Sequence, residues 1–258
     1  MTHQQRVNVW TDQYPIHSYD VDTKARASLP ILCHMMQESA WKHAENLGLG
    51  YQALLDDNLV WVLARQLVEM DVYPRWGDTI TIKTWATGRE RLFWYRDFKI
   101  LDADGNQLGK GSTAWFVIDR ETRKPQRADR LRYTLPEGFE RMFTARPAKV
   151  ARPQTDEPVF NVKAGYRHLD VNQHVNNVKY LQWMLEGLDL TFHETHNLHT
   201  FEVNYLNEGG YGDNIVVVQQ PLAELSFLHS LQHAENGTEI CRAKTVWQPI
   251  GEAWEFNE

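Results

Sequence analysis

Apolar positions along the chain follow a helical period in two places and form strand-like runs elsewhere. From Pro30 to Gly48 they recur with the spacing of an amphipathic helix, with proline in its first turn and glycine just past its end. Runs rich in β-forming residues follow, and Asp104-Gly105 predicts a hairpin turn between the last two. These runs are residues 60–68, 79–85, 94–101 and 112–118. One helix followed by antiparallel strands is therefore expected in the first half.

The second half repeats this order. Apolar residues at Tyr180, Trp183, Met184 and Leu188 predict a helix with one buried face over residues 175–187. Strand-like runs follow the helix, and the last two are joined by an Asn-Gly turn at residues 236–237. These runs are residues 200–206, 214–220, 224–232 and 239–247.

A local match supports a duplication. Residues 73–80 and 208–215 share an aromatic-Gly-Asp-x-Ile core, and each stretch lies between two predicted strands. The two stretches are 135 residues apart, so a unit of about half the chain occurs twice. The length of 258 residues suits one large domain or two smaller ones.

The two halves are joined by a segment rich in proline and basic residues. Little apolar periodicity occurs there. Four of the ten prolines of the chain fall within it, and a fifth, Pro125, directly precedes it. We therefore predict an N-terminal unit over residues 1–125, a linker over 126–158 and a C-terminal unit over 159–258. Either the linker is a solvated connector or its basic charges bind an acidic partner.

Charge is distributed unevenly along the chain. The net charge is −7, which argues against a general nucleic-acid binder. Residues 119–152 hold ten basic and five acidic residues, a net +5, so the remainder of the chain carries −12. A basic strip on an acidic protein is a plausible contact surface for an acidic partner.

Composition narrows the cellular context. No run of about 18 uncharged apolar residues occurs, so no membrane span is expected. The N-terminus lacks the apolar core of a secretory signal. Cys33 and Cys241 lie far apart, and we expect both to be small core residues in a reducing cytoplasm.

The densest polar cluster is the stretch Asp-Val-Asn-Gln-His-Val-Asn-Asn-Val-Lys-Tyr at residues 170–180, at the start of the second helix. Asn176 or Asn177 can cap that helix, whose N-terminal N–H groups would polarise a carbonyl. A purely structural interpretation, in which these are loop and capping residues, is equally open on the residues alone.

The same stretch, extended to Glu186, closely resembles the active-site segment of the acyl-acyl carrier protein thioesterases, the plant plastid enzymes and their bacterial relatives. Further similar segments cover nearly the whole chain: Met-Gln-Glu-Ser-Ala at 36–40, Trp-Val-Leu-Ala-Arg at 61–65, Pro-Arg-Trp-Gly-Asp at 74–78 and residues 205–209. The resemblance implies an α+β tandem double hot-dog fold. It also implies a bacterial cytoplasmic enzyme of fatty acid biosynthesis.

The resemblance implies four catalytic residues: Asp170, Asn172, His174 and Glu208. Many plant members have a cysteine directly after that Glu, whereas this chain has Gly209, so a thiolate nucleophile at this position is excluded. Without the resemblance, Glu208 would be taken for a surface carboxylate in a turn.

A mechanism based on carboxylate and imidazole groups is the hypothesis that follows. Glu208 and His174 would orient and deprotonate water, and Asn172 would hold the water or the thioester carbonyl. Asp170 would orient His174 or Asn172, with direct carboxylate attack as the alternative. Backbone N–H groups of Asn177 and Val178 would polarise the thioester oxygen.

Only one half should be catalytic. Tyr73 occupies the place of Glu208 in the first half, and nothing like Asp-x-Asn-x-His precedes the first helix. That half is free to shape an acyl tunnel, although ordinary core packing is the favoured explanation of its apolar residues. The candidate tunnel residues are Met35, Met36, Trp41 and Trp61.

The expected partner is acyl carrier protein bearing an acyl chain on phosphopantetheine, and the expected reaction releases free fatty acid and holo-carrier protein. Docking is expected at Arg120, Arg123, Lys124 and Arg127. The alternatives are an acyl-coenzyme A thioesterase and a non-catalytic hot-dog protein that binds acyl thioesters. A monomer with internal pseudo-symmetry and a homodimer both fit.

No cofactor or metal is expected. His193, His196 and His199 recur at every third residue in a polar stretch, but they lack acidic or cysteine neighbours at ligand spacing, so a solvated loop is favoured.

Overall fold

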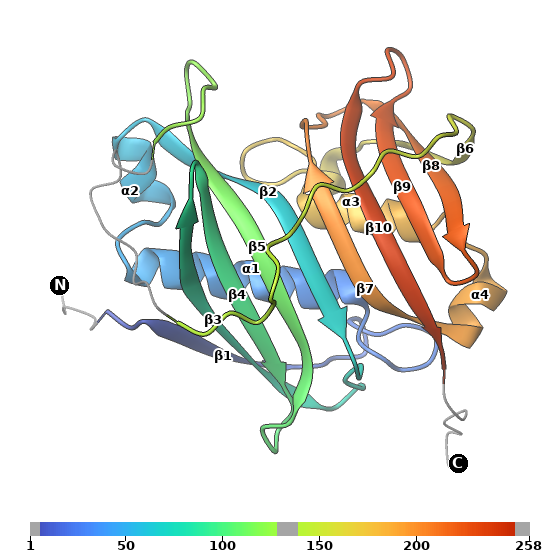
Figure 1. The fold of residues 1–258 in the computed structure, drawn as a ribbon, viewed down its shortest axis with the longest axis horizontal. Coiled ribbons are helices and arrows are strands. Elements are labelled where there is room, and N and C mark those ends of the chain that lie inside the picture. The colour runs from blue at the N-terminus through green and yellow to red at the C-terminus, as the bar shows by residue number, and fades with distance from the viewer. Residues whose placement is uncertain (1–5, 128–138, 251–258) are drawn as a thin grey trace. The chain divides into compact units, whose positions relative to one another are not determined.

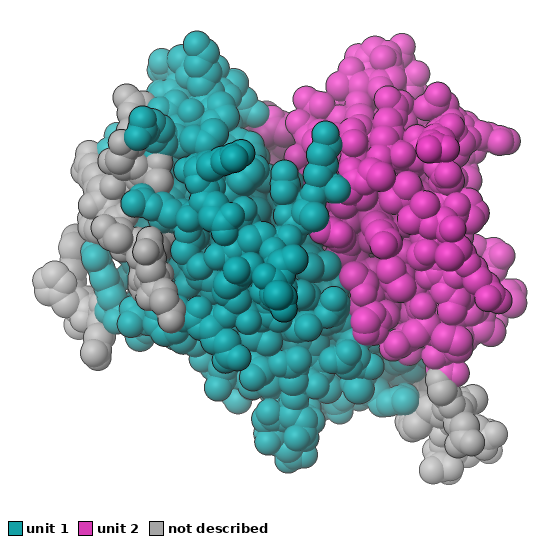
Figure 2. All heavy atoms as spheres, viewed as in Figure 1, with its two compact units in different colours: residues 1–149 teal, residues 150–258 magenta. Residues whose placement is uncertain are grey.

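The computed structural model describes residues 6–127 and 139–250. The chain divides into two compact units, unit 1 over residues 1–149 and unit 2 over residues 150–258 (Figure 2). The division falls inside the segment predicted as a linker. In the described part of the chain, no helix combines the length and the apolar character needed to cross a membrane.

In its described residues, unit 1 has two helices and five strands (Figure 1). Its sheet has the order β1-β3-β4-β5-β2, and each neighbouring pair is antiparallel. The elements are β1 (Val9–Pro15), α1 (Leu29–Asn46), α2 (Tyr51–Asp56), β2 (Leu59–Met70), β3 (Thr79–Glu90), β4 (Phe93–Leu101) and β5 (Gln107–Asp119).

Unit 2 follows the same path through its own sheet, in the order β6-β8-β9-β10-β7. Its elements are β6 (Pro158–Lys163), the 3₁₀ helix η2 (Tyr166–His168), α3 (Asn177–Leu185), α4 (Leu190–Thr195), β7 (His196–Tyr205), β8 (Asn214–Ala223), β9 (Ser226–His233) and β10 (Glu239–Pro249). Both sheets therefore place their strands in the same succession, which confirms the predicted duplication.

The long helix of unit 1 ends where the sequence predicts. Gly48 has a φ of 78°, which favours glycine, and the N–H of Leu49 reaches back to the carbonyl of Ala44 at 2.8 Å. The two hairpin glycines, Gly105 and Gly237, also have positive φ. The short helices α2 and α4 are absent from the sequence-based prediction, because six residues are too few to show a helical period.

Shifts in strand register curve both sheets. In unit 1 the β3–β4 ladder shifts between Ala86 and Gly88, and in unit 2 the β10–β7 ladder shifts between Val246 and Trp247. A bulge bends a strand and increases its twist, so each sheet can wrap around its long helix.

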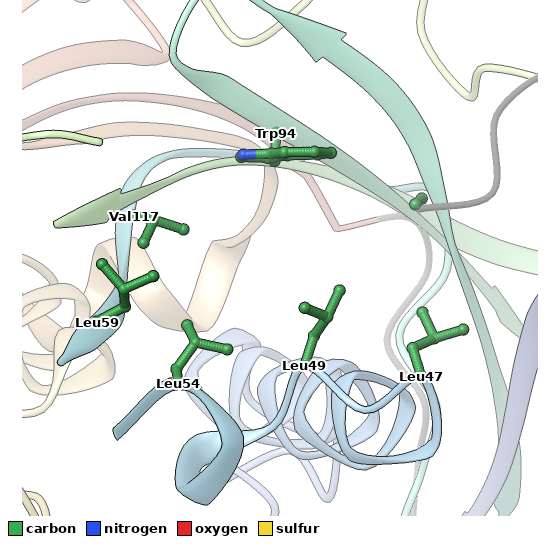
Figure 3. Close-up of a cluster of buried hydrophobic side chains, with 7 residues drawn as sticks. Leu47, Leu49, Leu54, Leu59, Trp94 and Val117 are labelled. Atoms are coloured by element: carbon green, nitrogen blue, oxygen red, sulfur yellow. The ribbon is translucent and has the colours of Figure 1, made fainter. Parts of the chain in front are cut away.

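A buried cluster joins α1, α2 and the strands of unit 1 (Figure 3). Leu47, Leu49 and Leu54 face Trp94 and Val117 across it. Burying each leucine side chain contributes about 1.5–3 kcal/mol to stability. This cluster therefore anchors the C-terminal end of α1.

The described part of the predicted linker is bound to the units. Trp85 donates its indole N–H to the carbonyl of Glu140 at 2.9 Å. Arg146 donates to the hydroxyl and the carbonyl of Thr87 at 2.7 and 2.8 Å. Residues 140–147 thus form a strap along the sheet of unit 1, and Arg146 belongs to that structure.

Candidate active site

The polar cluster begins at the N-terminus of α3. Asn176 is the cap, because its Oδ1 accepts the N–H of Val178 at 2.9 Å. That bond corrects one prediction: the Val178 amide is already engaged and does not polarise a substrate carbonyl. The N–H of Asn177, at the first helical position, is the amide that stays a candidate for this role.

A tight loop precedes the cap, and Asp170 shapes it. Asp170 Oδ1 accepts the backbone N–H groups of Asn172 at 2.8 Å and His174 at 3.3 Å. The N–H of Asp170 donates to the carbonyl of His174 at 2.8 Å, and Gln173 has a φ of 65°. The carboxylate therefore sets the backbone from which the Asn172 and His174 side chains extend.

The turn that carries Glu208 is tied to this loop. Gly209 accepts the N–H of Val175 through its carbonyl at 2.8 Å. Asp213 closes the turn by accepting the N–H of Gly210 at 2.7 Å. The bond between Val175 and Gly209 brings together segments that lie more than thirty residues apart in the chain.

The site forms where the two segments meet. His174 Nδ1 lies 3.5 Å from Glu208 Oε1, and each side chain is 38% exposed. Asn172 is exposed on the loop beside them. A partly solvated imidazole and carboxylate at this distance can activate water, since such contacts often tighten when substrate binds.

A second histidine, which the sequence did not single out, supports the loop. His168 Nδ1 accepts the N–H of Gly165 at 2.9 Å, and its ring packs edge-on against Trp183. Burial, then the nearby charges of Lys179 and Arg167, hold the pKa of His168 below its usual value. His168 is therefore a neutral structural residue.

Two family models match the chain, one for each unit. The acyl-ACP thioesterase N-terminal domain matches residues 7–130, and the acyl-ACP thioesterase C-terminal domain matches residues 152–249. The chain belongs to the acyl-ACP thioesterase family. The resemblance inferred from the motifs is thereby confirmed.

Curated relatives of this acyl-ACP thioesterase family member include plant proteins. It is similar to the chloroplastic oleoyl-acyl carrier protein thioesterase 2 of Arabidopsis thaliana, with 28% identity over 93% of this chain and 76% of the relative. A chloroplastic acyl-[acyl-carrier-protein] hydrolase of Cuphea viscosissima is 30% identical over 92% of this chain and 61% of that relative.

Solved structures confirm the predicted double hot-dog architecture. An acyl-ACP thioesterase from Bacteroides thetaiotaomicron superposes with a TM-score of 0.82 and 27% identity, covering 93% of this chain and 98% of that chain. The 12:0-ACP thioesterase from Umbellularia californica superposes with a TM-score of 0.83 at 23% identity, covering 96% and 100%, which supports the fold alone.

The acyl-ACP thioesterase chain contains the same loop in unit 1. Asp22 Oδ1 accepts the N–H groups of Lys24 at 2.8 Å and Arg26 at 3.1 Å, as Asp170 does in unit 2. Ala25, with a φ of 55°, occupies the place of Gln173. The aspartate therefore has a counterpart before the first helix, which the sequence pattern did not show.

The chemistry of the two loops differs. Arg26 takes the place of His174 and turns back onto Asp22, with Nη2 2.8 Å from Oδ2. Lys24 stands for Asn172, and Tyr73 stands for Glu208. At these equivalent positions, the loop histidine of unit 2 lies against the carboxylate of the following turn, whereas unit 1 has an arginine and a tyrosine. That one half alone is catalytic stays a prediction.

The predicted tunnel residues do not share one environment. Met36 is 1% exposed, and its methyl group lies against Gly111 of β5. Trp41 is 50% exposed, so it does not line the interior of unit 1, contrary to the prediction. Trp61 packs on the buried cluster of Figure 3 and donates to the Leu49 carbonyl at 3.1 Å. Met35 is partly buried.

Both cysteines are buried and free. Burial raises the pKa of the Cys33 thiol to about 12, although a bond from Gln66 opposes the shift. Burial, with a contribution from Glu239, also raises the pKa of Cys241. Neither thiol forms a thiolate readily at neutral pH, so both are poor nucleophiles.

The basic residues predicted to dock the carrier protein follow β5. Asp119 closes this turn by accepting the N–H and hydroxyl of Thr122 at 2.8 and 2.9 Å. Arg120, Arg123, Lys124 and Arg127 are all exposed. Two other basic residues of the strip, Arg130 and Arg132, lie outside the described residues.

The three histidines at 193, 196 and 199 do not lie in a solvated loop. His193 belongs to α4, where its Nε2 donates to the Leu185 carbonyl at 2.9 Å. His196 stacks on Phe192 at the start of β7. Hydrophobic neighbours thus override the polar local pattern. Over residues 6–127 and 139–250, no group of three or more His, Cys, Asp or Glu is arranged to hold a metal ion.

Proposed function

We propose that this protein hydrolyses fatty acyl-ACP thioesters and releases free fatty acid and holo-ACP. The observation that carries the proposal is the His174–Glu208 pair at 3.5 Å, present in one half only, in a chain whose two units match the acyl-ACP thioesterase domains. Its relatives from Arabidopsis and Cuphea are a thioesterase and a hydrolase of acyl carrier protein substrates.

The thioester carbonyl is already electrophilic. The main requirement for hydrolysis is therefore an activated water. Glu208 and the imidazole of His174 orient a water molecule and accept its proton as the oxygen attacks the carbonyl carbon. Charge develops on the carbonyl oxygen, where Asn172 and the N–H of Asn177 stabilise it. The C–S bond then breaks, and the phosphopantetheine sulfur leaves with the proton.

Asp170 acts in this scheme through the backbone. The two N–H groups bound to its Oδ1 belong to Asn172 and His174, the residues assigned above to the carbonyl and the water. We place the reaction in a bacterial cytoplasm, where the buried free thiols Cys33 and Cys241 stay reduced.

Alanine substitution at the pair tests this proposal. We expect His174→Ala and Glu208→Ala each to lower kcat about 10²- to 10³-fold, because each removes a group that moves a proton or stabilises charge in the transition state. Hydrolysis of acyl-ACP and acyl-coenzyme A across chain lengths is the measurement.

Unit 1 supplies the matched controls. Lys24→Ala and Arg26→Ala change the positions equivalent to Asn172 and His174, and both variants should retain the wild-type rate. Full activity of His174→Ala and Glu208→Ala would reject the site, and no turnover of either thioester by the wild-type protein would reject the enzyme.

The exposed turn after β5 is the proposed contact for acyl carrier protein. We expect reversal of charge at Arg120, Arg123 and Arg127 to raise KM for acyl-ACP several-fold with little change in kcat, because these charges steer encounter with an acidic partner. Reversal at three exposed lysines on strands, Lys83, Lys163 and Lys244, is the control. An unchanged KM in the arginine variant would reject this surface.

A further inference from the structure

A turn precedes β3 in unit 1 and β8 in unit 2. Each turn is held against the long helix of its own unit, but by different contacts. In unit 2, the hydroxyl of Tyr180 on α3 accepts the N–H of Gly209 at 2.9 Å. Tyr180 is 2% exposed, so this bond is buried. It joins the helix that starts at the His174 loop to the residue that follows Glu208.

The equivalent positions in unit 1 are Leu32 and Pro74. Pro74 accepts the N–H of Ala27 through its carbonyl at 2.8 Å, as Gly209 accepts that of Val175. Leu32 is fully buried where α3 has Tyr180. Proline has no N–H, so an apolar side chain can face it without leaving a buried donor unpaired.

The fold therefore does not require the polar contact. Unit 1 builds the same loop, the same turn and the same strand order with an apolar pair. The hydrogen bond occurs only in the unit that places Glu208 against His174.

We propose that Tyr180 is a positioning residue for the thioesterase reaction, a role that rests on the proposed function. The N–H of Gly209 and the carbonyl of Glu208 belong to one planar peptide unit. By holding that amide, the Tyr180 hydroxyl fixes the direction in which the Glu208 side chain extends toward His174.

Gly209 is the matching half of this contact. A Cβ at this position would lie 3.1 Å from the Tyr180 hydroxyl and 3.4 Å from both Ile215 and Val175. A side chain at position 209 would thus push the Tyr180 hydroxyl away from the backbone amide, whereas glycine leaves room for the short hydrogen bond.

Tyr180→Phe is the first test. We expect kcat for acyl-ACP to fall about tenfold while KM changes less than twofold, the loss that follows from one hydrogen bond. Hydrogen exchange at the Gly209 amide should accelerate by about the same factor. Tyr14→Phe, which removes a hydroxyl bonded to Ser39 and Asp12 in unit 1, is the control and should keep the wild-type kcat.

Grafting the unit 1 pair separates positioning from folding. Tyr180→Leu alone leaves the Gly209 amide unpaired and should lower Tm. Adding Gly209→Pro removes that amide, so the double variant should recover most of the lost Tm but not the lost kcat.

The outcomes are distinguishable. Recovery of kcat together with Tm in the double variant, or wild-type kcat in Tyr180→Phe, overturns this proposal alone. A wild-type protein that hydrolyses no acyl-ACP overturns the proposed function and this proposal with it.

Discussion

Asp170 shows how a residue in an active-site motif can serve the backbone. Its counterpart Asp22 accepts the same two N–H groups in a loop that has no histidine and no glutamate partner. The aspartate is therefore explained by loop geometry in both units, which favours orientation of His174 over direct carboxylate attack.

Asparagine at position 170 separates these two roles. Asp170→Asn keeps an acceptor oxygen for both N–H groups, so we expect kcat to fall only about tenfold, less than the 10²- to 10³-fold loss expected for His174→Ala. Asp22→Asn should have the wild-type kcat. Complete loss of turnover in Asp170→Asn, with an intact fold by circular dichroism, would instead support a carboxylate nucleophile.

At the scale of elements, α3 joins the loop, the Glu208 turn and the core of unit 2. Its N-terminus depends on Asn176, which caps the helix and also donates its N–H to the carbonyl of His168 at 2.9 Å. The carboxyl end of the loop and the first turn of the helix are thus one hydrogen-bonded unit.

Removal of the Asn176 cap should lower both the stability of the protein and its catalytic rate. We expect Asn176→Ala to lower the free energy of unfolding by about 1 kcal/mol, and to lower kcat because the end of the loop is held less firmly at the helix N-terminus. Denaturant unfolding and steady-state kinetics check the two parts. Asn176→Asp retains a capping oxygen and should unfold like the wild type; equal losses in both variants would contradict the capping argument.

At the scale of the whole molecule, the two units can be compared position by position, because they have the same strand order. In the sheet registers, His229 pairs with Gln219 in unit 2 where Phe98 pairs with Thr84 in unit 1. His229 is fully buried; Thr245 bonds its Nε2 at 2.9 Å, and its Nδ1 has no partner among the described residues. Burial lowers the pKa of His229 to about 3.

This histidine should make the protein less stable in acid. An unfolded histidine has a pKa of about 6.5, so between pH 6.5 and about 3 the unfolded state binds a proton that the folded state does not, and stability falls as the pH drops. At pH 5 the effect is about 2 kcal/mol.

His229→Phe should remove that part of the pH dependence. We expect the free energy of unfolding to fall by about 2 kcal/mol less between pH 8 and pH 5 in the variant than in the wild type. Denaturant unfolding at both pH values is the measurement, and pH 8, where the histidine is neutral in both states, is the internal control. Parallel pH profiles would contradict the assignment.

Local signals in the sequence determined the elements and the repeat. Helix period, strand runs and turn glycines such as Gly48 and Gly105 depend on neighbouring residues. They can therefore be recognised in the sequence without knowledge of the tertiary structure. The duplication was recognisable from the two Gly-Asp turns for the same reason. The active-site motif was recognisable because it lies on one continuous stretch of sequence.

Tertiary structure decided which of these residues meet. The His174–Glu208 contact spans two segments whose approach depends on backbone bonds through Gly209, and sequence spacing does not encode it. The Asp22 loop was hidden because Lys24 and Arg26 changed the side chains while the backbone hydrogen bonds stayed the same. Trp41 lies five residues after Met36 and therefore off the buried stripe of α1, so Met36 is buried and Trp41 is exposed.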